Sequence, residues 1–515
     1  MITRRQFLYS LLGSAGASIL SACTTTDSVV NTPTATSPLW QSTGLDSTRT
    51  IDPIPTTTTS DIFTPDVELT LRATATQFEF QKGQLTQVLQ YVGHVEKGDK
   101  DVLQPIPNSY LGPTIHLKRG QKVRVTLINE LPVETIIHWH GQHLPEEMDG
   151  HPRYAIDSGE TYVYEFEVTN RAGTYWYHPH PHQNTGAQAY FGLAGLLLIH
   201  EEKEANYDLP QGEYDLPFVI QDRTFANNNQ LQYVNNGHQI MVGYWANTIL
   251  VNGQLNYQQT IANVPYRLRL LNGSNARIYK LAWHDGTPIT VIGTDGGLLA
   301  APEQRDYIML APGERLDIWA DFSESEGRIL QALPFEGANS RVVDILPFIV
   351  NRTANSNATL PAQFAPLAFY EATDAINYDN PRLFNFFVNH MTPTIDGQVF
   401  EMNKATEQEQ VRLNTLEVWE ITNDLNQGGF PHPIHIHGVQ FQILERSIDR
   451  AHRAVWETIR EGYVDSGWKD TILLMPGERA KILIKFEDYT GLFLYHCHNL
   501  EHEDGGMMRN YQVVA

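Results

Sequence analysis

Residues 491–507 read GLFLYHCHNLEHEDGGM, an apolar strand that ends in His-Cys-His and continues through a further histidine to a methionine. A similar stretch, GTYWYHPH, occupies residues 173–180. Each is preceded in the chain by a His-x-His-Gly unit, HWHG at 138–141 and HIHG at 435–438. The same pair of motifs therefore occurs twice, which indicates that the chain repeats one β-domain.

Other strands repeat three times. A strand that ends in asparagine occurs at 123–129, 266–272 and 417–423, and a Gly-Glu pair leads a later strand at 159–160, 313–314 and 477–478. Short alternating strands separated by glycine and proline are typical of antiparallel sandwiches and barrels, and the best helix candidate is the short stretch 451–462. We predict an all-β chain with domain 1 at 67–205, domain 2 at 213–350 and domain 3 at 380–515, as many domains as 515 residues suggest.

The histidine motifs have the composition of a metal cluster. Side chains alternate along a strand, so the two histidines of a His-x-His unit share a face and lie about 6.5–7 Å apart, a spacing that suits neighbouring ions. The eight imidazoles are those of His138, His140, His178, His180, His435, His437, His496 and His498. Three copper ions that need three, three and two nitrogens would use all eight. Domain 2 has no counterpart, so we expect it to be a structural spacer and the metal site to lie between domains 1 and 3.

Cys497 lies between two of these histidines, so its side chain points to the opposite face and belongs to a different metal centre. His432, His502 and Met507 complete a set of one thiolate, two imidazoles and one thioether, and the spacing favours Met507 over Met508. This set favours a blue copper electron-transfer site over a tetrahedral zinc site. The short path from Cys497 to its flanking histidines would connect the two centres.

These segments resemble the multicopper oxidases, which include laccases and bacterial cuprous oxidases, and the resemblance covers residues 67–515. It implies three cupredoxin-like Greek-key barrel or sandwich domains and four copper ions. It also implies that one-electron oxidation of a donor is coupled to the four-electron reduction of dioxygen to water. The implied ligands are His432, Cys497, His502 and Met507 for type 1 copper, His138 and His435 for type 2 copper, and His140, His178, His180, His437, His496 and His498 for the type 3 pair.

Two carboxylates match positions that supply protons in this family, Asp149 and Glu503. Proton delivery needs an acid within one water of the reacting oxygen. The alternative is that each is a solvated surface carboxylate. Asp504 is a weaker candidate for the same role.

The methionine content bears on the electron donor. The nine methionines are scattered, without the methionine-rich insert common in cuprous oxidases, which favours phenols or aromatic amines, as in laccases. The alternatives are oxidation of Cu(I) or another reduced metal ion, and a non-catalytic copper protein of the cell envelope. The charged and aromatic segment 446–469 is a candidate lid over the donor site or a structural excursion. The net charge of -23 argues against a nucleic-acid partner.

The N-terminus has the pattern of an export signal. Residues 1–23 combine the pair Arg4-Arg5, a short apolar stretch and the lipobox-like end Leu20-Ser21-Ala22-Cys23. We expect twin-arginine export and a periplasmic or envelope location, with a lipid on Cys23. The only other cysteine is Cys497, so no disulfide is expected. Residues 24–66, rich in Thr, Ser and Pro, are expected to be a disordered tether.

Overall fold

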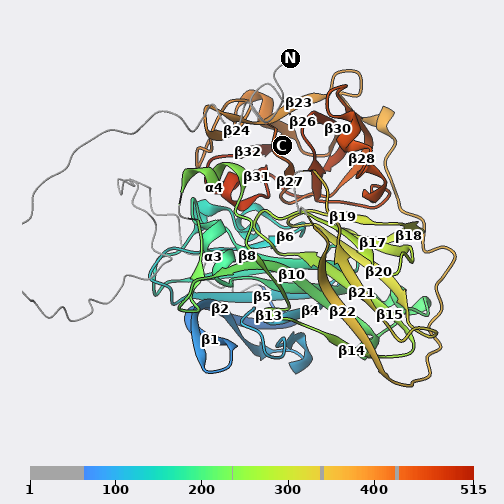
Figure 1. Ribbon diagram of the computed structural model, residues 1–515. Helices are drawn as coiled ribbons and strands as arrows, with labels where there is room; N and C mark the ends of the chain where they lie inside the picture. Colours follow the sequence, from blue (N-terminus) through green and yellow to red (C-terminus); the bar gives the residue numbers. More distant parts are fainter. Residues whose placement is uncertain (1–62, 235, 337–340, 424–428) are drawn as a thin grey trace, which may run out of the picture. The chain divides into compact units, whose positions relative to one another are not determined.

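The computed structural model describes residues 63–515 except 235, 337–340 and 424–428. The predicted signal peptide and most of the predicted tether lie outside the described residues. None of the described helices is long and apolar enough to cross a membrane. Figure 1 shows that the described chain consists of strands joined by loops and a few short helices. These are α2 (Glu146–Asp149), α3 (Thr185–Phe191), α4 (Gly237–Val242), α5 (Arg453–Trp456) and α6 (Leu500–Asp504).

Each predicted domain range holds two sheets. In domain 1 one sheet has the order β2 (Gln84–Lys97), β1 (Val67–Gln81), β5 (Lys122–Asn129), β7 (Thr161–Glu167), and the other β3 (Leu103–Gln104), β4 (Thr114–Lys118), β9 (Gly195–His200), β8 (Gly173–Pro179), β6 (Ile137–His140). In domain 3 the orders are β24 (Thr392–Ile395), β23 (Arg382–Asn389), β26 (Thr415–Asn423), β30 (Glu478–Phe486), β28 (Phe441–Ile448), and β25 (Gln410–Arg412), β32 (Met508–Val514), β31 (Gly491–Cys497), β27 (His432–Ile436), β29 (Thr471–Leu474).

Domain 2 has the larger first sheet. Its order is β13 (Gln254–Leu255), β12 (Thr248–Val251), β10 (Asp215–Phe225), β15 (Pro265–Asn272), β20 (Arg315–Asp321), β17 (Ile289–Thr294), β18 (Gly297–Arg305), with β11 (Leu231–Gln232) beside β10. The second sheet has the order β14 (Gln259–Ala262), β22 (Val343–Arg352), β21 (Gly327–Ala332), β16 (Tyr279–Trp283), β19 (Ile308–Leu310).

The three repeated strands have equivalent places. β5, β15 and β26 each pair in parallel with the first long strand of their domain and antiparallel with the strand that follows the Gly-Glu turn. The mostly β architecture predicted from the sequence is thus confirmed. Apolar side chains of the facing sheets form the cores, for example around Trp419 and Ile482 in domain 3.

The repeated asparagine has a physical reason. In β5 the Asn129 side-chain amide donates to the carbonyls of Val133 and Ile156, and the Asn129 carbonyl accepts a hydrogen bond from the N–H of Gly159. The same bonds recur at Asn272 with Gly313 and at Asn423 with Gly477. All three glycines have φ between 77° and 84°, a conformation that costs glycine little. One asparagine therefore ties the strand end to the turn in every copy.

The helix expected at 451–462 is broken. The structure has α5 followed by a separate 3₁₀ turn at Arg460–Gly462. The Thr458 hydroxyl donates to the Val455 carbonyl, a local bond that competes with helix continuation.

Candidate metal centre

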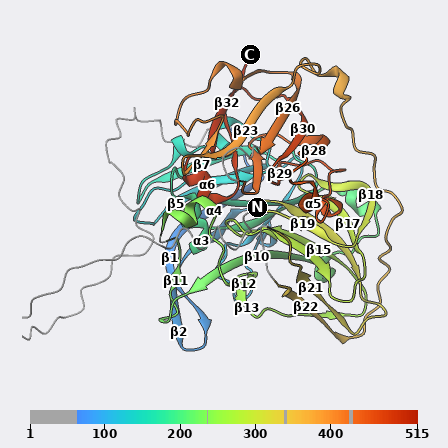
Figure 2. The same ribbon diagram turned by 45° about the horizontal axis from the view of Figure 1, so that its top comes forward.

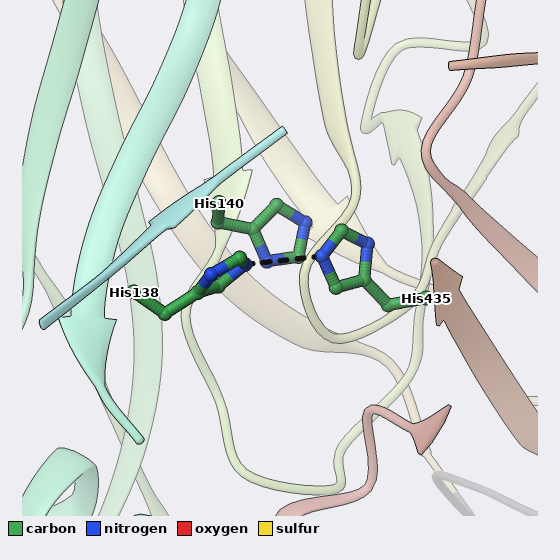
Figure 3. Close-up of side chains that lie close together, drawn as sticks. All are labelled: His138, His140 and His435. Carbon is green, nitrogen blue, oxygen red and sulfur yellow. Dashed lines mark hydrogen bonds between the residues drawn. The ribbon is translucent and has the colours of Figure 1, made fainter. Parts of the chain in front are cut away.

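Two strand pairs bring the four His-x-His units together. β6 pairs with β8 so that His138 lies opposite His178, and β27 pairs with β31 so that His435 lies opposite His496. The ends of these strands in domains 1 and 3 face one another, and His138 Nε2 lies 3.2 Å from His435 Nε2 (Figure 3). All eight imidazoles are buried, as the predicted location between domains 1 and 3 requires.

The ring nitrogens form groups of three, and His140 belongs to two of them. Nitrogens within each group lie within 4.8 Å of one another, and the groups are His138 with His140 and His435, His140 with His178 and His498, and His180 with His437 and His496. The last two groups supply three nitrogens each. His138 and His435 remain as the pair that would serve one further ion.

The electrostatics fit a metal cluster rather than a hydrogen-bonded core. Burial, followed by repulsion from neighbouring imidazoles or from a nearby arginine, lowers the pKa well below the ordinary value at His138, His140, His180, His435, His437 and His498. Burial lowers the pKa of His178 to about 3. Neither ring nitrogen of the buried His498 has a hydrogen-bond partner among the described residues. Neutral imidazoles whose lone pairs converge without donors are what bound copper ions require, so the residues fit the metal.

A second group lies on the other side of β31. Cys497 Sγ lies 3.4 Å from His432 Nδ1 and 3.6 Å from His502 Nδ1, and the two Nδ1 atoms are 3.2 Å apart. All three side chains are buried. Met507 packs in the same cluster as Cys497, whereas Met508 packs elsewhere with Phe400 and Leu494. The thiol, two imidazoles and Met507 match the donor set of a blue copper site.

Comparison with known proteins agrees with this geometry. Two family models described as multicopper oxidase match residues 91–204 and 375–515. The chain is 36% identical to the multicopper oxidase mco of Staphylococcus haemolyticus, across 86% of this chain and 88% of the relative, and 32% identical to a laccase of Bacillus stratosphericus, across 78% and 89%. The crystal structure of McoA multicopper oxidase from Aquifex aeolicus superposes with a TM-score of 0.76 and 34% identity, covering 88% of this chain and 97% of that one. The chain belongs to the multicopper oxidase family.

As a multicopper oxidase it is an oxidoreductase, and the carboxylates predicted to supply protons lie beside the clustered histidines. Asp149 Oδ2 lies 2.7 Å from His437 Nδ1, and the Asp149 carbonyl accepts a hydrogen bond from His138 Nδ1 at 2.7 Å. Glu503 lies 3.5 Å from His180 Nε2 and 3.2 Å from His496 Nδ1. Both carboxylates are buried, which contradicts the alternative of solvated surface groups.

Asp504, the weaker candidate, has another role. Its carboxylate accepts hydrogen bonds from the N–H groups of Thr185 and Gly186 at 2.9 and 2.8 Å. These are the first residues of α3, so Asp504 ties the helix of domain 1 to α6 of domain 3.

The contact between Asp470 and Arg315 was not predicted from the sequence. Asp470 Oδ1 lies 3.0 Å from His140 Nε2, and the Asp470 carbonyl accepts from His435 Nδ1 at 2.8 Å. Arg315 of domain 2 donates to both Asp470 carboxylate oxygens at 2.7 and 2.6 Å. Domain 2 supplies none of the clustered histidines, as expected of a structural spacer, but its Arg315 also holds Asp470, whose carboxylate contacts His140 and whose main-chain carbonyl contacts His435. The available signal was an arginine at the start of the mostly buried strand β20, since a buried charge needs a partner.

The segment 446–469 packs against domain 2. Lys280 Nζ donates to the Thr458 carbonyl at 2.8 Å, and Gly296 N–H donates to the Trp468 carbonyl at 2.9 Å. Arg446 forms a two-bond pair with Asp465 within the segment. Among the bonds of the described residues, none joins this segment to His432, Cys497, His502 or Met507. Its role as a lid stays a prediction without a supporting contact.

Proposed function

We propose that this multicopper oxidase oxidises phenols or aromatic amines and reduces dioxygen to water, with one type 1, one type 2 and two type 3 copper ions. The observation that carries the proposal is the environment of the blue copper residues. Among the described residues, no carboxylate bonds to the imidazole of His432 or His502, and the polar contacts of these two rings are with each other, Cys497, Asn499 and the Met241 carbonyl. A donor site for metal ions would offer acidic or multiple thioether ligands.

The ligand arrangement defines how the chain serves this reaction. Bound copper supplies one-electron redox chemistry at one site and reduction of dioxygen at the other. Cys497 belongs to the blue copper group, and its neighbours His496 and His498 belong to the clusters of imidazoles. The covalent backbone between these residues is therefore the shortest connection between the two groups. Both sites are buried, which excludes bulk water from them.

The chain's own acids relay protons from solvent. Reduction of one dioxygen to two waters consumes four electrons and four protons. Both oxygens of Glu503 and Oδ1 of Asp149 are buried without a hydrogen-bond partner among the described residues, so they are free to bond to water. Glu503 lies beside His180 and His496, which belong to the same group of three imidazoles, and Asp149 lies beside His138 and His437. We assign both as proton donors, with Asp149 also orienting His437.

The test is oxygen uptake by copper-loaded protein with 2,6-dimethoxyphenol and, separately, with chelated Cu(I). Cys497→Ser serves as the blank, because it lacks the thiolate and hence electron transfer to the cluster. Fast uptake with the phenol supports the proposal. A strong preference for Cu(I) would replace the organic donor by a metal-ion donor. No uptake with either, in fully loaded blue protein, would contradict the oxidase function itself.

We also propose export by the twin-arginine route and lipidation at Cys23, which the sequence alone supports. Labelling with a palmitate analogue tests this in cells that express the full chain. Label is expected in the wild type and absent from Cys23→Ser. Replacing Arg4 and Arg5 by lysine is expected to leave the protein inside the cell.

A further inference from the structure

A cleft lies where domain 1, domain 2 and the linker at 351–379 meet. The linker runs past β18 in Figure 2, and the Phe364 N–H donates to the Ala300 carbonyl of that strand at 2.8 Å. The cleft has a volume of about 260 Å³. Because small-molecule sites in proteins enclose about 300–1,000 Å³, this volume suits a ligand with a single ring. None of the residues that line the cleft is a clustered histidine or a blue copper residue.

Three aromatic side chains from different parts of the chain line the cleft. The rings of Tyr207 and Phe364 contact edge to face, with their centroids 5.1 Å apart. The ring of Trp468 packs against Phe369 at 5.2 Å, and the Trp468 carbonyl accepts a hydrogen bond from the Gly296 N–H at 2.9 Å. These contacts hold the rings in place before a ligand arrives. Fixed rings favour an aromatic ligand, because ring pairs gain free energy beyond that of the buried area.

The charged groups of the cleft do not cancel. The lining holds three cations and two carboxylates, namely Arg119, Arg171, Lys203, Glu201 and Glu204. Arg119 pairs with Glu201 at 2.6 Å, and Glu204 pairs with Arg267 of domain 2 at 3.2 Å. Among the ion pairs of the described residues, none includes Arg171 or Lys203. Two cations without a paired carboxylate favour an anionic ligand over a neutral or cationic one.

Arg171 is held in a fixed position. Its two terminal nitrogens donate to the carbonyls of Gly296 and Leu298, each at 3.1 Å. These carbonyls carry no charge, so the positive charge of Arg171 is not neutralised. A guanidinium has five N–H donors, and three of those of Arg171 have no bond within the part of the chain that the structure describes. Such a planar group with remaining donors is suited to a carboxylate.

We propose that this cleft binds small aromatic carboxylates. The ring of the ligand lies among Tyr207, Phe364 and Trp468, and its carboxylate bonds to Arg171 and Lys203. Binding is non-covalent and does not depend on which compound donates electrons to copper. The site therefore goes beyond the proposed oxidase reaction, and each can fail without the other.

Isothermal titration calorimetry of the copper-loaded protein with cinnamate tests the proposal. Cinnamate has the ring and the carboxylate but no phenolic hydroxyl, so it does not serve as an electron donor. Cinnamamide keeps the shape without the charge, and cyclohexanecarboxylate keeps the charge without the aromatic ring. We expect one cinnamate to bind per chain, cinnamamide to bind about tenfold more weakly or less, and cyclohexanecarboxylate about threefold more weakly or less.

Two variants locate the bound ligand. Arg171→Gln should weaken cinnamate binding about tenfold or more, because a hydrogen bond to a charged group is lost. Lys203→Gln should weaken it by up to about fivefold, and it changes an exposed side chain that the fold does not need. Lys82→Gln is the matched control, because Lys82 is also exposed but does not line the cleft, and it should bind cinnamate like the wild type.

Four results would overturn the inference. Absence of cinnamate binding at millimolar concentration removes the site, equal binding of cinnamamide removes the carboxylate, and equal binding of cyclohexanecarboxylate removes the aromatic requirement. Wild-type affinity in both Arg171→Gln and Lys203→Gln places the ligand elsewhere. If Arg171→Gln does not fold, the comparison of Lys203→Gln with Lys82→Gln decides. Because the heat of binding needs no turnover, absent oxygen uptake would contradict the proposed oxidase function and leave this result unaffected.

Discussion

Replacing Arg315 by methionine tests whether domain 2 maintains the copper cluster. Arg315 is fully buried and uses its guanidinium in three domains: it donates to the Thr174 carbonyl of domain 1, to the Gly313 and Asp295 carbonyls of domain 2, and to both carboxylate oxygens of Asp470 in domain 3. Burial alone would lower the pKa of Arg315, but Asp470 and Asp295 outweigh it and raise the pKa, so the group stays charged.

The expected cost follows from what methionine leaves behind. Removal of one partner from a buried ion pair costs about 3–5 kcal/mol, since the other charge remains buried without compensation. Three carbonyls also lose a donor. Asp470 then no longer holds His140 Nε2 in a fixed orientation, and loss of such a contact lowers metal affinity by about 10- to 100-fold.

Two measurements separate these effects. Urea unfolding of copper-free Arg315→Met, followed by tryptophan fluorescence, reports stability, and copper per chain after dialysis against a chelator reports retention. Arg352→Met is the matched control, because Arg352 pairs with Glu213 on the surface, where an ion pair contributes about 0–1 kcal/mol. Arg315→Lys keeps the charge without the two-bond fork and should fall between the wild type and Arg315→Met. If Arg315→Met unfolds like the control and keeps its copper, the clamp assigned to domain 2 is wrong.

Three further predictions concern domain 3. Glu503→Gln should lower kcat by about 100-fold or more, with an unchanged rate of anaerobic bleaching, because an amide cannot supply the proton; steady-state oxygen uptake measures this. Met507→Leu should raise the blue copper potential in a redox titration while leaving the unfolding midpoint nearly unchanged, because leucine fills the space without a thioether. Burial would raise the pKa of Glu409, but the hydrogen bonds and charge of Arg509 outweigh it, so the pKa in the folded protein is lowered. The pair therefore stabilises the fold above the unfolded pKa of about 4.3, and this stability is lost as the pH falls from there through the lowered folded pKa. The urea midpoint of Glu409→Gln should therefore be lower than that of the wild type at pH 7, and the difference should shrink at pH 3.

The sequence predicted what repeats or has a fixed spacing. Asn129, Asn272 and Asn423 mark the same strand end in each domain, because each side chain donates to two main-chain carbonyls of the loop and turn that follow. The His-x-His units predicted a shared ligand cluster because strand alternation fixes which side chains share a face. Cys497 could be separated from its neighbours by the same rule.

Contacts between domains were not predictable in this way. Arg315 and Asp470 are 155 residues apart in sequence, and Met241 contributes a carbonyl rather than a side chain to His502. A backbone acceptor leaves no trace in residue type. A short helix without buried side chains also has no apolar periodicity to reveal it.

These contacts explain why a domain without copper ligands belongs to the site. Domains 1 and 3 each contribute imidazoles whose ring nitrogens face those of the other, as His138 Nε2 faces His435 Nε2 at 3.2 Å. Arg315 supplies a charged bond across all three domains that does not depend on metal, and Asp470 transmits it to His140 and His435. The ligand positions are therefore set before copper arrives, so metal binding is not required to draw the domains together. The same domain also contributes the Met241 carbonyl that accepts a hydrogen bond from His502, so domain 2 contacts both groups of clustered histidines.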